Sequence, residues 1–167
     1  MQRLISALSL RFNGNDFMKD KDVFYMERAL TLAQKALAYG EVPVGSIIVL
    51  DDQMISEGYN CPISTHDCSA HAEMISLRLA SKKIENYRLI NSIVYVTLEP
   101  CLMCVGAMIH ARVSRLVFGA YDPKAGAVSS QINSLEFPWL NHKIKYTGGV
   151  LAEECGDILK QFFKERR

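Results

Sequence analysis

The chain has 167 residues, of which 49% are hydrophobic and 22% are charged, so it is long enough and apolar enough to bury one core. This composition excludes an intrinsically disordered chain, a collagen-like repeat and a coiled coil, and no stretch approaches the roughly 18 apolar residues of a membrane span. Nineteen Lys and Arg against eighteen Asp and Glu give a formal net charge of +1, so a nucleic-acid partner would need a local basic surface.

Residues 1–20 are predicted to form a flexible N-terminal extension ahead of a single domain over residues 21–167. A short apolar run between Arg3 and Arg11 resembles a signal or transit peptide, but the run is short and no cleavage site of small residues follows it. A frayed extension is therefore the preferred interpretation, with Met18 as an alternative start.

Helices and strands alternate along the first half of the domain. Apolar residues recur at helical spacing from Met26 to Leu37, and two apolar runs joined by a short acidic turn predict an antiparallel hairpin. The predicted elements are, in order, a helix ending before Gly40, strands over residues 44–50 and 54–59, a loop over 60–69 and a helix over about 70–80.

The second half continues the alternation. Its predicted elements are a strand over residues 92–97, a helix from Pro100 to about His110, a strand over 115–119, a long polar loop, a weaker strand over 143–146 and an amphipathic helix over 152–164. Helices interleaved with strands in this way predict an α/β domain whose helices cover both faces of the sheet.

Cys101 and Cys104 form a Cys-x-x-Cys pair at a predicted helix start. Five cysteines are too few for a disulfide scaffold and indicate reduced thiols in a cytoplasmic protein. A redox pair or two buried structural cysteines are alternatives to a metal site. Residues three apart share one helix face, and the positive end of the helix favours the thiolate form, so the position favours metal binding.

His71 completes a set of metal ligands, although a single histidine is more often structural. One imidazole and two thiolates are three zinc ligands, and a catalytic zinc leaves its fourth position to water. A structural zinc needs a fourth protein ligand, and His66, Cys61 and Cys68 are candidates that the sequence leaves open.

Glu73 favours the catalytic interpretation. It follows His71 by two residues, so the two side chains converge only if His71 lies at the very start of its helix. A carboxylate placed there can exchange protons with water on the metal. The alternative is an anion that merely stabilises the first turn of a helix.

Together these motifs resemble the zinc-dependent nucleoside deaminase superfamily, and within it the bacterial tRNA-specific adenosine deaminases. The resemblance runs from about Phe24 to the C-terminus, and HAE and PCxxC belong to the whole superfamily. The stretches that point to the tRNA-acting family are EVPVG, YRLI, YVTLEPCLMC, GAMIHARVSRLVFGAYDPKAG, NHK and DILKQFFKERR. The resemblance implies a three-layer α/β/α cytidine-deaminase-like fold with a mixed five-stranded sheet, and a homodimer.

The resemblance also implies a reaction and its residues. One Zn²⁺ per subunit is held by His71, Cys101 and Cys104, and Glu73 carries protons while wobble adenosine in a tRNA anticodon is hydrolysed to inosine. Asn60 is expected to hydrogen-bond the flipped base, although a turn residue would serve equally at that position. The remaining residues of the implied base pocket are Val44, Ala72, Leu98 and Pro100.

In the resembled enzymes a loop and the last helix grip an anticodon stem-loop, and the corresponding residues here are Asp122, Lys124, Phe162, Phe163 and Arg166. Composition alone instead favours a solvated helix face with buried Phe. Cys61, Cys68 and Tyr121 depart from residues found in some relatives, and each departure removes a possible phosphate contact.

Two other functions compete with tRNA editing. A free-base or nucleoside deaminase of the guanine or cytosine type would use the same zinc ligands and the same Glu73. A non-catalytic RNA-binding or structural-zinc module would need a fourth protein ligand and would have no use for Glu73. We expect a cytoplasmic enzyme with no membrane partner.

Overall fold

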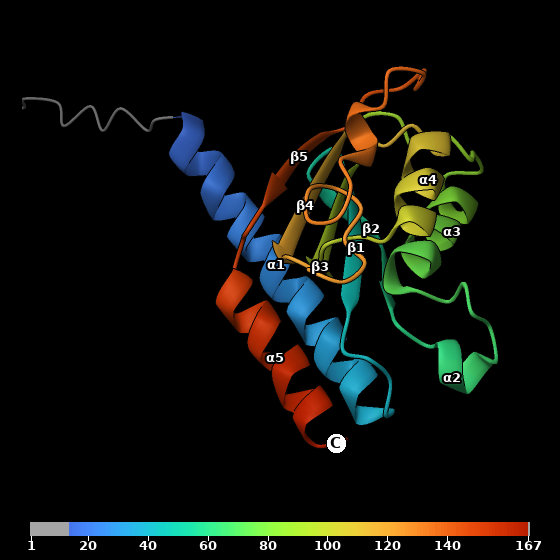
Figure 1. Ribbon diagram of the computed structural model, residues 1–167. Helices are drawn as coiled ribbons and strands as arrows, with labels where there is room; N and C mark the ends of the chain where they lie inside the picture. The colour runs from blue at the N-terminus through green and yellow to red at the C-terminus, as the bar shows by residue number, and fades with distance from the viewer. Residues whose placement is uncertain (1–13, 167) are drawn as a thin grey trace, which may run out of the picture.

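A computed structural model describes residues 14–166 of the chain (Figure 1). The apolar run near the start of the predicted extension lies outside these residues. The first helix, α1 (Gly14–Ala38), begins before the predicted domain boundary, so residues 14–20 are helical and Met18 lies within α1. Gly40 follows α1 with a positive φ of 77°, in agreement with its predicted place at the end of this helix.

Five strands form one mixed sheet, as predicted. They are β1 (Gly45–Leu50), β2 (Gln53–Tyr59), β3 (Ile93–Leu98), β4 (Arg115–Ala120) and β5 (Lys145–Gly148). Their order across the sheet is β2-β1-β3-β4-β5, with β1 antiparallel to β2 and β3, and β3, β4 and β5 parallel. Because β3 and β4 are parallel, the segments that follow them emerge at the same edge of the sheet.

The hairpin of β1 and β2 turns at Asp51 and Asp52, whose φ angles are 50° and 60°. Two central residues of positive φ match the twist of the flanking strands, and Asp tolerates this conformation. The acidic turn in the sequence therefore gives the tight hairpin that was predicted from it.

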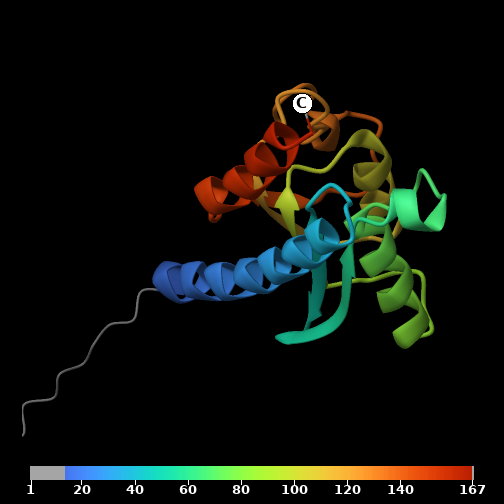
Figure 2. The same ribbon diagram turned by 90° about the horizontal axis from the view of Figure 1, so that it is seen from below.

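Helices cover both faces of the sheet, which confirms the three-layer α/β/α fold. Figures 1 and 2 show α1 and α5 (Ala152–Lys164) on one face, and α3 (Ala72–Lys83) and α4 (Leu102–His110) on the other. Side chains of β1 alternate between the two cores: Ile48 packs under α3 and α4, whereas Ile47 and Val49 pack under α1.

Two glycines let the helices lie directly on the hairpin. A Cβ at Gly58 would lie 2.5 Å from the carbonyl oxygen of Ala72, in the first turn of α3. A Cβ at Gly45 would lie 2.0 Å from the carbonyl oxygen of Ala29 in α1. The close approach at Gly58 fixes where α3 begins relative to the sheet, and therefore where His71 is placed.

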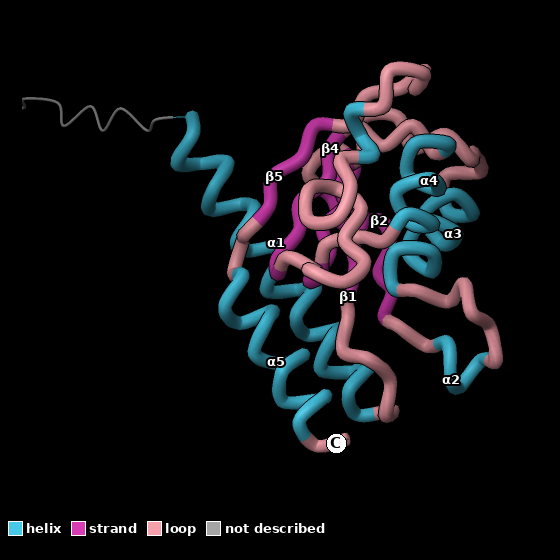
Figure 3. Tube along the Cα trace, viewed as in Figure 1, coloured by secondary structure: helices cyan, strands magenta, loops and turns pink. Residues whose placement is uncertain are grey.

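Three local predictions were incomplete or wrong. The predicted loop over residues 60–69 contains a short helix, α2 (Pro62–Thr65), and the long loop contains a 3-10 turn over Ser134–Glu136. Figure 3 shows that the long loop between β4 and β5 is irregular chain apart from this turn. Pro100 does not open a helix: α4 begins at Leu102, because the residue before it keeps an extended backbone. Among the described residues no helix is long and apolar enough to cross a membrane.

Candidate active site

Two helix starts meet at the edge of the sheet where β3 ends. His71 caps α3 with φ and ψ of −71° and 152°, and Cys101 caps α4 with −76° and 170°. Both residues therefore have extended backbones and stand just outside the first helical turn. His71 was predicted at this position, whereas Cys101 was predicted on the helix itself.

The three predicted ligands are brought together. The Sγ atoms of Cys101 and Cys104 each lie 3.6 Å from Nδ1 of His71, and the two sulfurs are 3.7 Å apart. All three ligand atoms lie within 4.8 Å of one another. One imidazole nitrogen and two thiol sulfurs are donors that zinc prefers, and three protein ligands leave a position open.

The alternative fourth ligands lie elsewhere. Within residues 14–166 the structure adds no other His, Cys, Asp or Glu to the His71–Cys101–Cys104 cluster. Sγ of Cys61 lies 3.9 Å from the carbonyl oxygen of Ala70, and Cys68 is exposed. This geometry disfavours a structural zinc site.

The protonation of the cluster is uneven. Hydrogen bonding with Cys104, followed by that with His71, lowers the pKa of Cys101 to about 4 against the opposing effect of burial. Hydrogen bonding with Cys101 and burial raise the pKa of Cys104 above its ordinary value. Without metal, the pair therefore carries one negative charge, and a metal ion must displace the proton of Cys104.

Glu73 lies in the first turn of α3 with only 4% of its surface exposed. Burial raises its pKa to about 7, the negative charge of Cys101 adds to the rise, and His71 partly offsets it. A carboxyl group with a pKa near 7 both accepts and releases protons readily at neutral pH.

Asn60 is tied to the start of α3. Its Oδ1 accepts a hydrogen bond of 2.8 Å from the backbone N–H of Ala72, and its own N–H donates to the carbonyl of Val44 at 3.1 Å. Among the described residues these two hydrogen bonds use Oδ1 and the backbone N–H of Asn60, so the N–H groups of Nδ2 are available to a ligand. Val44 and Ala72 are buried, and Leu98 ends β3 beside them.

Glu99, between Leu98 and Pro100, has a different environment. Its carboxylate accepts hydrogen bonds from the N–H groups of Asp122, Val128, Ser129 and Ser130, and from the hydroxyl of Ser130. Burial alone would raise the pKa of Glu99, but these donors outweigh it and lower the pKa. The loop over residues 122–130 is thereby fastened to the turn that carries Cys101.

The sequence did not single out Glu99, nor the buried Glu41. The carboxylate of Glu41 accepts hydrogen bonds from the N–H groups of Ile63 and Ser64 at 3.2 and 2.7 Å, which fixes α2. A charged residue directly before Pro100 and Cys101 is the only signal for Glu99 in the sequence. Its donors lie more than 20 residues further along the chain, so that signal does not identify them.

The candidate RNA-contact residues are not all at the surface. Lys124 is exposed, and Asp122 accepts a hydrogen bond of 2.9 Å from its N–H. Phe163 is half exposed, but Phe162 is 3% exposed and belongs to the core, so its side chain is not available to RNA. Arg166 stacks over Phe162 at 3.8 Å and donates to the carbonyl of Gly40 at 2.9 Å.

The burial of Phe162 has a signal in the sequence. Cys155, Leu159 and Phe162 follow one another at helical spacing, and all three are buried on the face of α5 that packs on the sheet. Phe163 lies outside this face. The periodicity of α5 therefore separates the two phenylalanines, which the resemblance alone did not.

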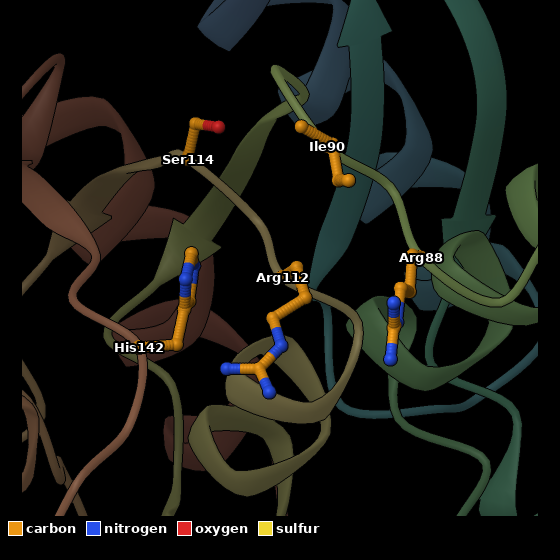
Figure 4. A pocket seen from close by; sticks show the side chains of 5 residues that line it. All are labelled: Arg88, Ile90, Arg112, Ser114 and His142. Atoms are coloured by element: carbon orange, nitrogen blue, oxygen red, sulfur yellow. The ribbon is translucent and has the colours of Figure 1, made fainter.

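A pocket of about 300 Å³ lies away from the cluster (Figure 4). Its lining residues are Arg88, Ile90, Arg112, Ser114 and His142. Four of these directly precede β3 or β4, so the pocket lies at the opposite edge of the sheet from the cysteines. None of the His71–Cys101–Cys104 cluster or Glu73 lines this pocket.

Comparison with known proteins identifies close relatives. The family described as MafB19-like deaminase matches residues 19–167. A tRNA-specific adenosine deaminase of Haemophilus influenzae is 52% identical over 143 residues, which span 85% of this chain and 83% of the relative. The enzyme of the same name from Bacillus subtilis is 42% identical over 147 residues, which span 88% and 91% of the two chains.

Two solved structures are similar to this chain. One from studies of A-to-I editing by tRNA:A34 deaminases at the wobble position of transfer RNA has a TM-score of 0.79 and 39% identity, covering 81% of this chain and 99% of that chain. A guanine deaminase from Nitrosomonas europaea has a TM-score of 0.70 at 20% identity, covering 96% and 98% of the two chains. The second likeness shows a common fold alone.

Proposed function

The chain belongs to the tRNA-specific adenosine deaminases of the cytidine deaminase superfamily, and from this premise we propose that it hydrolyses wobble adenosine in a tRNA anticodon to inosine and ammonia. One observation carries the proposal: the buried carboxyl group of Glu73 lies in the helical turn that begins at the His71–Cys101–Cys104 cluster. A structural metal site has no use for a carboxyl group of raised pKa.

We propose that His71, Cys101 and Cys104 hold one Zn²⁺ per chain. Their donor atoms are the right kind and number for a catalytic site with one open position. Bound zinc lowers the pKa of water toward neutrality, which supplies the nucleophile of a hydrolytic deamination.

Glu73 moves the protons. In its ionised form the carboxylate accepts a proton from the attacking water and delivers it to the ring nitrogen beside the amino-bearing carbon of adenine. It then passes the second water proton to the amino group, which leaves as ammonia when its bond to the ring carbon breaks. Burial keeps the pKa of Glu73 near 7, so the same group serves as base and as acid.

Asn60 orients the base. Because Ala72 donates to its Oδ1, the side chain of Asn60 is held with the N–H groups of Nδ2 left to donate to the base, and this suits an acceptor atom of the purine ring. The side chains of Val44 and Leu98 and the backbone near Pro100 complete the proposed pocket.

The RNA partner follows from the reaction. An adenine must leave its stack to reach a buried carboxyl group, and an anticodon loop offers unpaired bases that can do so. Lys124 and Phe163 are exposed for RNA contact, and Arg166 adds a positive charge. A tRNA substrate supports the proposal of a cytoplasmic enzyme.

We also propose a homodimer that forms over α4. Leu102 and Met103 are exposed apolar residues at its start, and a Cβ at Gly106 would meet no atom within 4 Å. An apolar helix face at the surface is typical of an interface. Sedimentation should give twice the chain mass, and Met103→Lys should give a monomer; a monomeric wild-type protein would contradict this part of the proposal.

The test of function offers the wild-type enzyme an anticodon stem-loop with wobble adenosine, the same stem-loop with wobble guanosine, and free adenosine, guanine and cytosine. Inosine should form only in the first, and Glu73→Gln at equal zinc content should form none above background. Ammonia from the free bases or nucleosides without inosine in RNA would favour the free-base deaminase, the second candidate that the guanine deaminase fold brings forward.

A further inference from the structure

An exposed tyrosine stands at the end of α1. Tyr39 is 64% exposed and stacks on Tyr59, with ring centroids 6.1 Å apart and planes 12° from parallel. Nζ of Lys35 lies 4.8 Å from the centre of the Tyr59 ring. We call these three residues the tyrosine platform. Tyr59 packs against the Tyr39 ring in an offset parallel arrangement that restricts its orientation, and the exposure of Tyr39 leaves much of its ring open to a partner.

The tyrosine platform lies at the same edge of the sheet as the metal ligands. Tyr59 is followed by Asn60, whose Oδ1 accepts from the N–H of Ala72, the residue after His71. Figure 1 shows the carboxyl end of α1 at the lower end of the molecule, together with α2 and the end of α5. Tyr39 therefore lies at the same end of the sheet as the proposed base pocket beside Asn60.

Positive charge flanks the open ring. Arg166 donates to the carbonyl of Gly40, next to Tyr39, and Lys35 lies beside Tyr59. Within residues 14–166, neither Lys35 nor Arg166 forms an ion pair with a carboxylate. Fixed aromatic rings between unpaired cations are typical of surfaces that bind single-stranded nucleic acid, because bases stack on the rings while cations attract phosphates.

We propose that Tyr39 stacks on an unpaired base of the RNA loop, next to the base that enters the pocket. Tyr59 holds the ring of Tyr39 in place, and Lys35 and Arg166 attract the neighbouring phosphates. The inference rests on the proposed function, since it takes the partner to be a structured RNA with an unpaired loop. It adds a binding residue on the α1 face of the sheet, opposite to the face that carries the metal ligands.

The first experiment measures affinity and chemistry separately. The full-length, zinc-loaded enzyme and its Tyr39→Ala, Tyr39→Leu and Tyr39→Phe variants are titrated with the anticodon stem-loop, and single-turnover rates are measured at saturating enzyme. Loss of a stacked base should raise Kd about tenfold in the Ala and Leu variants and leave the saturated rate within twofold. Phe should restore the wild-type Kd, because the ring and not the hydroxyl makes the contact.

Tyr87 supplies a matched control. It is also 64% exposed and has a cation at its ring, Arg88 at 5.3 Å, but it lies at the opposite edge of the sheet, before β3. Tyr87→Ala should leave Kd unchanged. The Leu variant of Tyr39 keeps an apolar cover on Tyr59, so a wild-type Kd in that variant would show that Tyr39 only protects the fold.

The second experiment identifies the stacked base. Each loop nucleotide is made abasic in turn, and Kd is measured with the wild type and with Tyr39→Ala. At one position, removing the base should weaken wild-type binding about tenfold and leave the binding of the variant unchanged, because the same contact is already lost. If every position weakens both proteins equally, or if Tyr39→Ala binds within twofold of wild type, the inference is wrong.

Failure of the inference about Tyr39 can be distinguished from failure of the proposed function. If the wild-type enzyme forms inosine in the stem-loop and Tyr39→Ala binds equally well, the proposed function stands and the tyrosine platform does not. If the wild-type enzyme neither binds nor deaminates the stem-loop, the proposed function fails and the inference fails with it.

Discussion

Two buried glutamates lie close to the cysteine pair: Glu73 in the first turn of α3, and Glu99 in the turn after β3 that binds the loop over residues 122–130. Their pKa values are shifted in opposite directions. Burial dominates at Glu73 and raises its pKa to about 7. At Glu99, donors from four backbone N–H groups and a hydroxyl outweigh burial and lower the pKa. Burial and the charge of Cys101 therefore prevail at Glu73, whereas hydrogen-bond donors prevail at Glu99.

The opposite pKa shifts indicate different roles for the two glutamates. A carboxylate saturated with donors stays ionised and holds chain segments together, so Glu99 is a structural anchor. A buried carboxyl group with its pKa near neutral is suited to carry protons, which is the role proposed for Glu73. Substitution of each by Gln, which keeps the size and removes the charge, should therefore affect different measurements.

The largest effect is expected from Glu73→Gln. Loss of the proposed proton carrier should lower the rate of inosine formation by roughly 10²- to 10⁴-fold. Zinc content and Tm should not fall, since Gln removes a buried group whose ionisation is opposed by its surroundings. An enzyme within tenfold of wild-type activity would remove Glu73 from the mechanism.

The next largest loss of turnover is expected from substitutions of Asn60. Asn60→Asp keeps an oxygen for the N–H of Ala72 but loses the amide donor, whereas Asn60→Ala loses both. Both should lower turnover by about 10²-fold with zinc content unchanged, because each leaves the base without its donor. If only the Ala variant is impaired, Asn60 acts by holding the start of α3 and not by binding the base.

Glu99→Gln should act on stability. The amide N–H₂ of Gln would face N–H donors where an acceptor is needed, which destabilises the fold by about 2–4 kcal/mol. Tm should fall by roughly 10 °C in a protein of this size, with a smaller loss of turnover per folded molecule than in Glu73→Gln. A variant as stable as wild type would show that the loop over residues 122–130 does not depend on this carboxylate.

The smallest effect is the pH dependence of the difference in stability between wild type and Glu99→Gln. Because the folded pKa of Glu99 is lowered, its ionisation stabilises the fold above the unfolded pKa of glutamate and ceases to do so as pH falls through the folded pKa. The gap in unfolding free energy between wild type and Glu99→Gln should therefore be full at pH 7 and shrink below about pH 4. Urea unfolding across this range measures it, and a gap independent of pH would contradict the assignment.

The sequence predicted the parts of the fold that depend on local pattern. Periodicity placed most helices and strands within a few residues, and Asp51 and Asp52 predicted the hairpin turn. It missed α2 and the start of α1, which begins at Gly14 and not near Met26. His71, Cys101 and Cys104 were predicted as a cluster because their chemistry is scarce and specific. The extended backbone at Cys101 was missed, because Pro is also common at the first position of a helix.

What the sequence could not predict depends on contacts between distant segments. The hydrogen-bond donors to Glu99 come from a loop more than 20 residues away, and no sequence pattern near Glu99 indicates them. The stacking of Tyr39 on Tyr59 likewise joins α1 to β2. Phe162 was misplaced because a family likeness carries residues over by position, whereas burial depends on the face of α5.

The central claim is that the metal has three protein ligands and one open position facing a proton carrier. X-ray absorption at the zinc edge of the zinc-loaded enzyme tests it most directly. We predict one imidazole nitrogen and two sulfurs as the protein ligands, from His71, Cys101 and Cys104. A third sulfur or a second imidazole, from Cys61, Cys68 or His66, would fill the open position and contradict the account.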